Sequence, residues 1–387
     1  MKILMVHPHD LWYDPWTIRI LELARGVQRR GHQVQLCHMP RKEQPNHAPI
    51  RRPEDGDPPI HALQPRQQHV IPNSRLLATL AKECDLIHLQ KSFASVSLPL
   101  LWIARRLNKP LHYDWDDHET AIARQVEPRF FARLQLAVYE TWLPHFATTI
   151  SYASQALKTR ALRCGFPSER LYPIPVGADT ERFHPALRDK SILAGYGLDP
   201  EAVTVLYLGQ LEGAAHASRL VEAAPLVLER ASKIQFLFAG GGEQLEALRQ
   251  QAQTSPARDA LKIAGYIPYE KVPGIVGAAD ICVACFDDDE ASQAKSPLKI
   301  AEYLAAGKAI VASRVGEAPW MVEGCGEVVP PQNAAALADG ILRYALDQEK
   351  RQRDGEKARQ RALDYFTWER GTETLMHAYL QTQPSPR

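Results

Sequence analysis

The chain has 387 residues, of which 45% are apolar and 24% are charged, and these values are typical of a globular protein with room for two domains. Lysine and arginine total 46 against 45 aspartates and glutamates. Because a dedicated nucleic-acid-binding protein would carry a basic excess, we expect no nucleic-acid partner. The start of the chain has too short an apolar stretch for a signal peptide, and no run reaches the ~18 apolar residues of a spanning helix. We expect a cytoplasmic protein, at most peripheral to the inner face of a membrane.

In the first half of the chain, strand patterns alternate with helical patterns, as in a parallel α/β sheet. Buried strands are expected at 2–7, 32–37, 85–89, 110–115, 147–151 and 171–175. Helical spacing of apolar residues predicts helices at 17–30, 98–107 and 128–144, and another that ends near residue 165. Residues 41–74 are rich in Pro, Gln, His and Arg without periodicity, which predicts a long loop.

The alternation restarts at residue 203, after a turn-rich segment at 179–201 that we interpret as a linker. Strands are expected at 203–209, 234–239, 261–264, 280–286 and 309–313, and helices at 218–231, 243–253, 269–278, 297–306 and 333–345, with further helix to the end. The sequence therefore predicts two Rossmann-like domains, residues 1–182 and 183–367, and a C-terminal helix of about 368–387 that packs back on the first. Ligands of such sheets bind beyond the carboxyl ends of the strands.

The six cysteines do not form a recognisable metal or redox site. Cys282 and Cys285 have C-x-x-C spacing, but they lie in the expected strand I-C-V-A-C-F, where their thiols point to opposite faces. No second pair is placed to complete a zinc site. A protein with reduced cysteines is expected.

The segment S-P-L-K-I-A-E-Y follows a strand and a polar loop, and it carries the clearest chemistry. Pro297 is the expected first residue of a helix and Ser296 its N-cap. Backbone N–H groups at a helix start bind anions such as a diphosphate. Lys299, in the first turn, is unfavourable with the helix dipole unless an anion lies beside it. Glu302, one turn further, can accept hydrogen bonds from two ribose hydroxyls; a solvated Lys–Glu pair is the alternative, which the position at a strand end disfavours.

These residues, together with V-L-Y-L-G-Q-L at 205–211, F-L-F-A-G-G-G-E at 236–243 and R-R-G-H-Q-V at 29–34, resemble glycosyltransferase family 4. The chain is similar to the subset with S-P-x-K-x-x-E-Y. The resemblance implies a GT-B fold, with two sheets facing across a cleft, and transfer of a hexosyl or N-acetylhexosaminyl group with retention. It implies a UDP- or GDP-sugar donor, a glycan, lipid-linked or small-molecule acceptor, and no further cofactor or metal. The implied donor-binding residues are Gly209, Gln210, Tyr266, Ile267, Lys295, Ser296, Pro297, Leu298, Lys299 and Glu302.

The chain departs from the family pattern around the donor diphosphate. The first of the family's two glutamates falls on Ala294. Gln210 stands at the position of an arginine, and a family lysine falls on Ala215 or His216. Each lost charged hydrogen bond is worth roughly 1.5–3 kcal/mol, so Lys295, Lys299 and Arg219 would have to compensate.

The segment Y-D-W-D-D-H-E ends a strand in the first half, and Asp116 stands where the family has its catalytic histidine. We expect Asp116 and His118 to contact the transferred sugar or the acceptor hydroxyl, because carboxylates and imidazoles grouped at a strand end favour proton transfer. A helix N-cap with solvated acidic residues is the alternative. Asp117, His9 and Trp12 are expected on the acceptor side, although Trp12 could equally cover the core.

Helix 128–144 mixes arginines with large apolar residues. Contact with a membrane is one interpretation, and an ordinary amphipathic core helix is the one we favour. A non-catalytic nucleotide-sugar-binding protein, motivated by Gln210, and a GT-B epimerase remain alternatives for the whole chain. A nicotinamide-dependent dehydrogenase is disfavoured, since no G-x-G-x-x-G follows the first strand. The sequence does not predict the oligomeric state.

Overall fold

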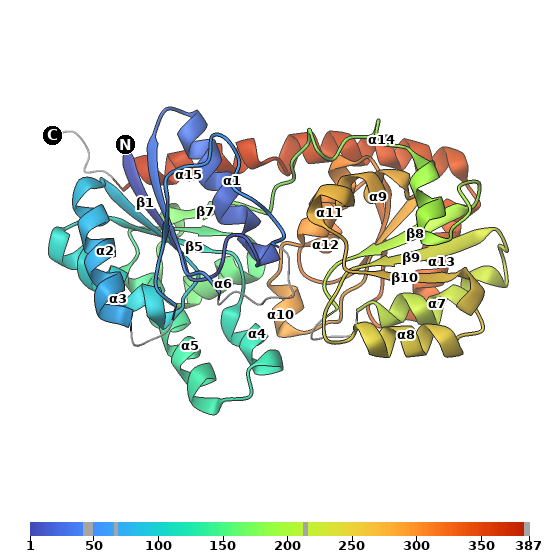
Figure 1. Cartoon of the computed structure of the whole chain (residues 1–387), viewed down its shortest axis with the longest axis horizontal. Helices are drawn as coiled ribbons and strands as arrows, with labels where there is room; N and C mark the ends of the chain where they lie inside the picture. Colours follow the sequence, from blue (N-terminus) through green and yellow to red (C-terminus); the bar gives the residue numbers. More distant parts are fainter. Residues whose placement is uncertain (42–48, 66–68, 212–215, 383–387) are drawn as a thin grey trace. The chain divides into compact units, whose positions relative to one another are not determined.

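The computed structural model describes residues 1–41, 49–65, 69–211 and 216–382. Its contacts divide the chain into two units (Figure 1). The first unit contains Met1–Val176, the short segment Ala294–Ser296 and the C-terminal part of the chain from Trp368. The second unit contains Gly177–Gln293 and Pro297–Thr367.

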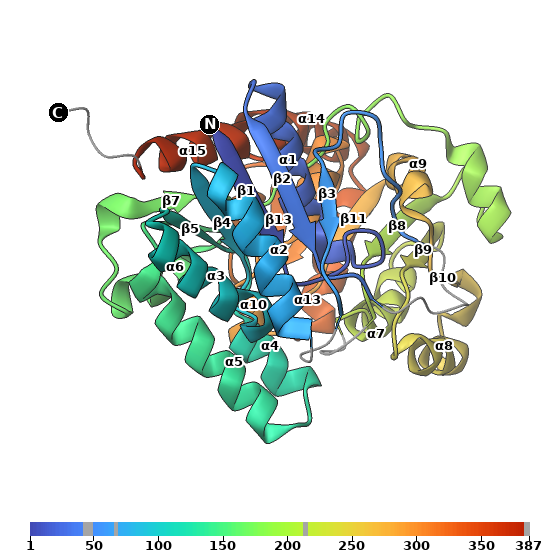
Figure 2. The same cartoon turned by 60° about the vertical axis from the view of Figure 1, so that its left-hand side comes forward.

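The first unit is built on a seven-stranded sheet with the order β3-β2-β1-β4-β5-β6-β7, in which every pair of neighbours is parallel. Its strands are β1 (Lys2–His7), β2 (Gln33–His38), β3 (Ile60–Ala62), β4 (Leu86–Gln90), β5 (Leu111–Trp115), β6 (Thr149–Tyr152) and β7 (Leu171–Pro173). Its α-helices are α1 (Ile18–Arg29), α2 (Val70–Glu83), α3 (Ala94–Leu107), α4 (Glu119–Val126), α5 (Phe130–Trp142), α6 (Gln155–Arg163) and α15 (Trp368–Leu380). Helix α1 packs against α15, and α2 packs against α3 (Figure 2).

The second unit is built on a six-stranded parallel sheet with the order β10-β9-β8-β11-β12-β13. Its strands are β8 (Val203–Leu208), β9 (Ile234–Ala239), β10 (Leu261–Gly265), β11 (Ile281–Ala284), β12 (Ala309–Ser313) and β13 (Gly326–Val329). Its α-helices are α7 (Ser218–Leu228), α8 (Leu245–Thr254), α9 (Val272–Ala278), α10 (Glu290–Gln293), α11 (Leu298–Ala305), α12 (Ala318–Met321), α13 (Ala334–Ala345) and α14 (Gln348–Tyr365).

The expected α/β architecture is confirmed, and every strand predicted from the sequence is present with bounds that differ by at most two residues. The prediction of a structureless loop at 41–74 is wrong, because β3 lies inside it and α2 begins at Val70. Both elements have weak patterns: β3 has three residues at the sheet edge, and α2 buries only Asn73, Leu77 and Ala81. Strand β13 was missed as well, for it starts at Gly326 and is short.

Two further expectations can be compared with the structure. Cys282 and Cys285 are both buried free thiols, as expected. The interpretation of the 128–144 segment as an ordinary core helix is wrong, because Glu140 is the one buried residue of α5. Its large apolar side chains are exposed to solvent instead, with Phe131 at 80%.

Candidate active site

Each sheet has a point where the strand order reverses, between β1 and β4 in the first unit and between β8 and β11 in the second. Ligands of open parallel sheets bind at such points, beyond the carboxyl ends of the strands. The segments that leave these strands carry nearly all the candidate residues. In the first sheet the candidate residues follow β1, β4 and β5, and in the second sheet they follow β8, β10 and β11.

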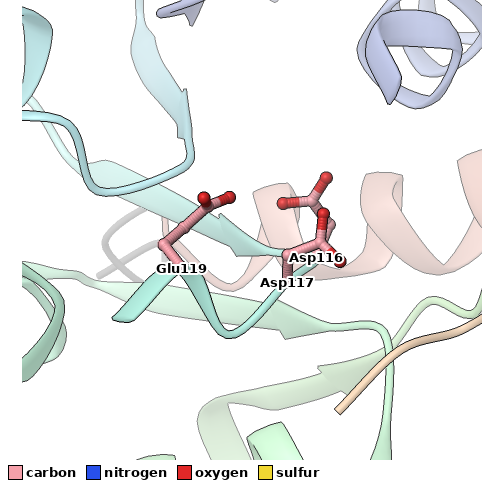
Figure 3. Close-up of side chains that lie close together, drawn as sticks. All are labelled: Asp116, Asp117 and Glu119. Carbon is pink, nitrogen blue, oxygen red and sulfur yellow. The ribbon is translucent and has the colours of Figure 1, made fainter. Parts of the chain in front are cut away.

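The first unit gathers three carboxylates just after β5, from Asp116, Asp117 and Glu119, which we call the carboxylate cluster (Figure 3). One oxygen from each lies within 4.8 Å of the others, a spacing that could hold a metal ion. In the structure a lysine contacts all three. The Nζ atom of Lys91 lies 3.3 Å from Asp116, 2.9 Å from Asp117 and 2.5 Å from Glu119.

Lys91 follows β4 directly and adopts a positive φ of 66°, which is uncommon for a residue with a side chain. Its side chain is only 3% exposed. Burial disfavours its charge, yet the three carboxylates together hold the pKa of Lys91 well above its usual value. The lysine is therefore a buried cation, and a metal ion would have to displace it from the carboxylate cluster.

The members of the carboxylate cluster differ in proton affinity. Burial raises the pKa of Asp116 to about 7, in spite of Lys91. Burial acts on Asp117 in the same direction, but Lys91 and Lys295 outweigh it and hold the pKa of Asp117 below its usual value. The amide of Gln90 also donates to Asp116, at 2.9 Å. One member can thus exchange a proton near neutral pH while another stays ionised, the arrangement expected of acid–base groups.

The alternative of solvated acidic residues at a helix N-cap does not describe this site, because the carboxylate cluster is largely buried and paired. His118 is the N-cap of α4, without a capping hydrogen bond from its side chain. Its ring is buried and its Nε2 atom lies 3.7 Å from Glu140. The carboxylate of Glu140 accepts hydrogen bonds from the backbone N–H groups of Glu119 and Thr120, at 3.0 and 2.8 Å. His118 thus lies beside the carboxylate that caps α4, and the structure does not bring it into the carboxylate cluster.

A buried ion pair supports β5 two residues before Asp116. The guanidinium of Arg19 donates two hydrogen bonds to Asp114, at 2.7 and 2.8 Å. The hydroxyl of Ser151 donates a third, at 2.5 Å, and Arg19 also donates to the carbonyl of Ile174. Arg19 lowers the pKa of Asp114 against the effect of burial. This network ties α1, β5, β6 and the end of the first sheet into one rigid support for the carboxylate cluster.

His9 and Trp12, expected on the acceptor side, both lie in the segment after β1. The ring of His9 packs edge-on against Phe93 with a centroid distance of 4.7 Å. Burial and the charges of Lys91 and Arg41 lower the pKa of His9 to about 3, so the imidazole is neutral near the carboxylate cluster. Trp12 packs edge-on against His38, 6.3 Å between centroids, and partly covers that strand end.

In the second unit, Lys299 lies over two aromatic rings. Its Nζ atom is 4.4 Å from the centroid of Tyr207 and 5.6 Å from that of Phe286, distances at which a cation is attracted to the ring face. Gly209 makes room for it, because a Cβ atom there would lie 2.4 Å from the Lys299 Nζ. Gly209 also has a φ of 152°, which favours glycine.

Glu302 lies one turn after Lys299 and is 3% exposed. Its carboxylate accepts a hydrogen bond of 3.1 Å from the hydroxyl of Tyr269. The next residue, Tyr303, accepts a hydrogen bond from the backbone N–H of Leu208. Helix α11 is thereby fixed to the end of β8, so Lys299 and Glu302 are held against the strand end rather than solvated on a helix surface.

The start of α11 differs from the expectation. The prediction that Ser296 is the N-cap and Pro297 the first helical residue is wrong: Pro297 is the N-cap and Leu298 begins the helix. The Ser296 hydroxyl instead accepts a hydrogen bond from the backbone N–H of Val176. Lys295, next to it, contributes to the low pKa of Asp117. Ala294, where the family has a glutamate, is buried in the core of the first unit.

The remaining donor-side candidates lie at the strand ends of the second unit. Gln210 is exposed directly after Gly209, while Tyr266 is 52% and Ile267 8% exposed after β10. Arg219, one of the compensating cations considered above, is paired with Glu222 at 2.9 Å. His216 accepts a hydrogen bond from the backbone N–H of Asp287. Ala215 lies outside the described residues.

Sequence reasoning missed Lys91, Tyr207, Tyr269 and Glu140. Lys91 had a signal, since it is a lysine directly after the expected buried strand L-I-H-L-Q. The others are aromatic or acidic residues inside regular elements. Nothing in their local sequence indicates that they contact Lys299, Glu302 or the start of α4.

Comparisons with known proteins agree with this architecture. Residues 17–182 match the family model "Glycosyltransferase Family 4", and residues 190–361 match "Glycosyl transferases group 1". The chain is 26% identical over 221 residues to the alpha-D-kanosaminyltransferase of Streptomyces kanamyceticus, covering 55% of this chain and 54% of that protein. It is 25% identical over 224 residues to the GDP-mannose-dependent alpha-(1-6)-phosphatidylinositol monomannoside mannosyltransferase of Mycobacterium tuberculosis, covering 57% and 58%. The aligned part thus spans little more than half the length of these curated relatives.

Solved structures resemble the chain over nearly its whole length. HepE of Anabaena in complex with UDP and glucose has a TM-score of 0.76 at 18% identity, covering 98% of this chain and 99% of that chain. Sucrose-phosphate synthase from Thermosynechococcus elongatus has a TM-score of 0.72 at 20% identity, with 98% of each chain covered. At these identities the likeness shows the fold, and it is the GT-B fold. The two glycosyltransferase family models match the two halves of the chain, at residues 17–182 and 190–361, and together with the glycosyltransferase relatives they support its assignment to glycosyltransferase family 4.

Proposed function

We propose that the protein transfers a sugar from a UDP- or GDP-sugar to a hydroxyl group of a glycan, lipid-linked or small-molecule acceptor, with retention at the anomeric carbon. The observation that carries the donor half of the proposal is Lys299, which lies in the first turn of α11 over the rings of Tyr207 and Phe286. A cation in the first turn opposes the helix dipole, and a diphosphate bound beside Lys299 would offset that opposition. HepE, a structural neighbour, was solved with UDP.

In the proposed reaction the bond between the anomeric carbon and the diphosphate breaks, and the acceptor oxygen forms the new bond on the same face. Lys299 and the N–H groups at the start of α11 stabilise the charge of the departing nucleoside diphosphate. Glu302, oriented by Tyr269, accepts hydrogen bonds from the ribose hydroxyls. Gly209, Gln210, Tyr266 and Ile267 line the donor site at the strand ends.

For the first unit we propose that Asp116 contacts the transferred sugar or the acceptor hydroxyl, with Asp117, His9 and Trp12 on the acceptor side. A carboxyl with a pKa of about 7 is suited to take up the acceptor proton at neutral pH. Lys91 is a positioning residue, because its contacts with all three members of the carboxylate cluster fix their orientation. His118 would act through Glu140 and α4, since its ring lies beside Glu140.

Thermal unfolding with a panel of UDP-, GDP- and ADP-sugars tests the donor site. A ligand at one hundred times its Kd should stabilise the fold by about 2.7 kcal/mol. Lys299→Ala and Glu302→Gln should each remove most of this shift. Lys233→Ala, which removes an exposed lysine of the second unit at the opposite end of β9, serves as the matched control and should keep it. Unchanged shifts in both site variants would refute the donor site.

The reaction itself is tested with the donor that binds and a panel of hydroxyl acceptors, followed by NMR of the anomeric configuration of the product. Donor alone is the control, since an epimerase would convert it without an acceptor. The exposed Gln210 at the family's arginine position favours one second candidate, a non-catalytic nucleotide-sugar-binding protein. Donor binding without turnover across the whole panel would support that candidate against transfer.

A further inference from the structure

Residues 8–17 follow β1, and we call them the braced loop because buried polar groups hold them in place. The carboxylate of Asp10 accepts hydrogen bonds from the backbone N–H groups of Trp12 and Tyr13, at 2.8 and 3.3 Å. Its second oxygen accepts a hydrogen bond from the backbone N–H of Arg41, at 2.7 Å. Asp10 is 2% exposed, so one buried side chain ties the loop to itself and to the segment after β2.

A second set of contacts holds the braced loop from residues that come later in the chain. The guanidinium of Arg51 donates hydrogen bonds to the hydroxyl of Thr17 at 2.9 Å and to the carbonyl of Asp14 at 3.3 Å. The backbone N–H of Ile50 donates to the carbonyl of Trp12 at 2.7 Å. A loop that is fixed in this way is preorganised, and a ligand that binds to it loses little free energy to ordering.

The braced loop carries three aromatic side chains that are only half buried, those of Trp12, Tyr13 and Trp16. A tryptophan that fills the core of the same unit, Trp115, is 1% exposed by comparison. Aromatic rings that a rigid loop leaves partly open to solvent indicate a ligand that packs on them.

A series of contacts leads from Trp16 to the carboxylate cluster. The ring of Trp16 packs edge-on against His9 with a centroid distance of 5.8 Å, and His9 packs edge-on against Phe93 at 4.7 Å. Phe93 comes two residues after Lys91, which contacts all three carboxylates of the cluster. The Arg41 guanidinium lies 5.9 Å from the Trp16 centroid, and its side chain is 55% exposed. Trp16 therefore has hydrogen-bond donors beside it and lies on the side of the proposed reacting group.

Two classes of acceptor pack on aromatic rings: apolar molecules such as lipids, and sugars. Among the described residues, no helix has the length and apolar character to cross a bilayer, which does not decide between the two classes. The polar groups beside Trp16 do. A pyranose has an apolar face of C–H groups and a rim of hydroxyls, so it can use the ring together with His9 and Arg41, whereas an apolar acceptor would use the ring alone.

We propose that the braced loop binds the acceptor and that this acceptor is a pyranoside, packed on Trp16 with Arg41 at its hydroxyls. Its role as the acceptor rests on the proposed transfer reaction, whereas its binding does not.

Saturation-transfer NMR of the full chain with methyl pyranosides, without any donor, tests this binding. The panel contains methyl glucoside, mannoside, galactoside and N-acetylglucosaminide, with sorbitol and hexanol as probes that lack a sugar ring. At least one pyranoside should bind about tenfold or more tightly than sorbitol, whose open chain has no apolar face. Trp16→Leu should weaken that binding by about tenfold or more. Arg41→Gln should weaken it by about tenfold, because hydrogen bonds to a charged group are lost.

Trp102→Leu is the matched control, because Trp102 belongs to the same unit and also has an arginine against its ring, with the Arg106 guanidinium 5.5 Å from the centroid. This variant should bind pyranosides like the unaltered protein. Equal losses in Trp16→Leu and Trp102→Leu would overturn the proposal, as would binding of hexanol without any pyranoside. If Trp16→Leu does not fold, unchanged binding in Arg41→Gln overturns it instead. Transfer to another hydroxyl compound by a protein that binds no pyranoside would refute this inference and leave the proposed transfer reaction in place.

Discussion

Replacing Asp116 by asparagine is expected to stabilise the protein at neutral and alkaline pH. Burial raises the pKa of this carboxyl from 3.8 to about 7, so the folded protein holds the proton more tightly than the unfolded chain. The resulting stability is fully present below pH 3.8 and is lost as the pH rises through 7. At about 1.4 kcal/mol per pH unit, ionised Asp116 costs about 4 kcal/mol of unfolding free energy at pH 8.

Asp116→Asn removes this cost, since the amide stays neutral and can still accept the hydrogen bond from Gln90. Thermal unfolding of both proteins between pH 4 and pH 8 measures the effect. We expect nearly equal Tm values at pH 4 and a higher Tm for the variant at pH 8, by on the order of 10 °C for a unit of about 200 residues. A buried charge that destabilises the fold is a common feature of functional sites.

Asp117→Asn is the matched control in the same cluster, and its effect should have the opposite sign. Lys91 and Lys295 hold the pKa of Asp117 below its usual value against the effect of burial, so its ionised form stabilises the fold above pH 3.8. That contribution is lost as the pH falls through the lowered pKa. Asp117→Asn should therefore lower the Tm at pH 8. If both variants shift the Tm in the same direction at pH 8, or if the effect of Asp116→Asn is the same at pH 4, this account of the cluster is refuted.

Two other substitutions test the supports of the site. Gly209→Ala should lower stability and displace the Lys299 side chain, which a Cβ would meet at 2.4 Å, and the nucleotide-dependent Tm shift should disappear. Gly56→Ala, at a φ of 93° with no neighbour within 4 Å, should cost about 1 kcal/mol of strain and keep that shift. Arg19→Met should lower the free energy of unfolding by about 3–5 kcal/mol in a denaturant titration, because it leaves Asp114 buried without its partner. A loss below 1 kcal/mol would show that Asp114 finds another partner.

Features carried by local patterns were predictable from the sequence. Apart from β3 and β13, the strands are largely apolar runs bounded by turns, and they were predicted to within two residues. Lys299 and Glu302 stand out because one helix carries them both, so their spacing alone places them near one face. Ser296 shows the limit of local rules. Its position favours an N-cap. Its hydroxyl instead accepts a hydrogen bond from the backbone N–H of Val176, 120 positions earlier in the chain.

The residues that escaped prediction depend on contacts between distant segments. Lys91 meets the carboxylate cluster because β4 and β5 are parallel neighbours, a pairing that no window of sequence contains. The same limit explains the error at α5. Apolar residues at helical spacing predict an amphipathic helix whether its apolar face meets a core or lies open. The two cases differ in whether another element covers that face, and in the structure none of the described elements buries it.

Lys91 also explains why the first unit can keep three carboxylates together. Fully ionised, Asp116, Asp117 and Glu119 would repel one another in a largely buried site, and one cation offsets only part of that charge. The excess of negative charge is reduced because the three carboxylates differ in proton affinity. Burial raises the pKa values of Asp116 and Glu119, while Lys91 and Lys295 keep Asp117 ionised. Neither Lys91 nor any single carboxylate would produce this difference in pKa by itself. The sheet creates it by bringing the ends of β4 and β5 together, so the proton-exchanging group of this chain is a consequence of strand order as much as of residue type.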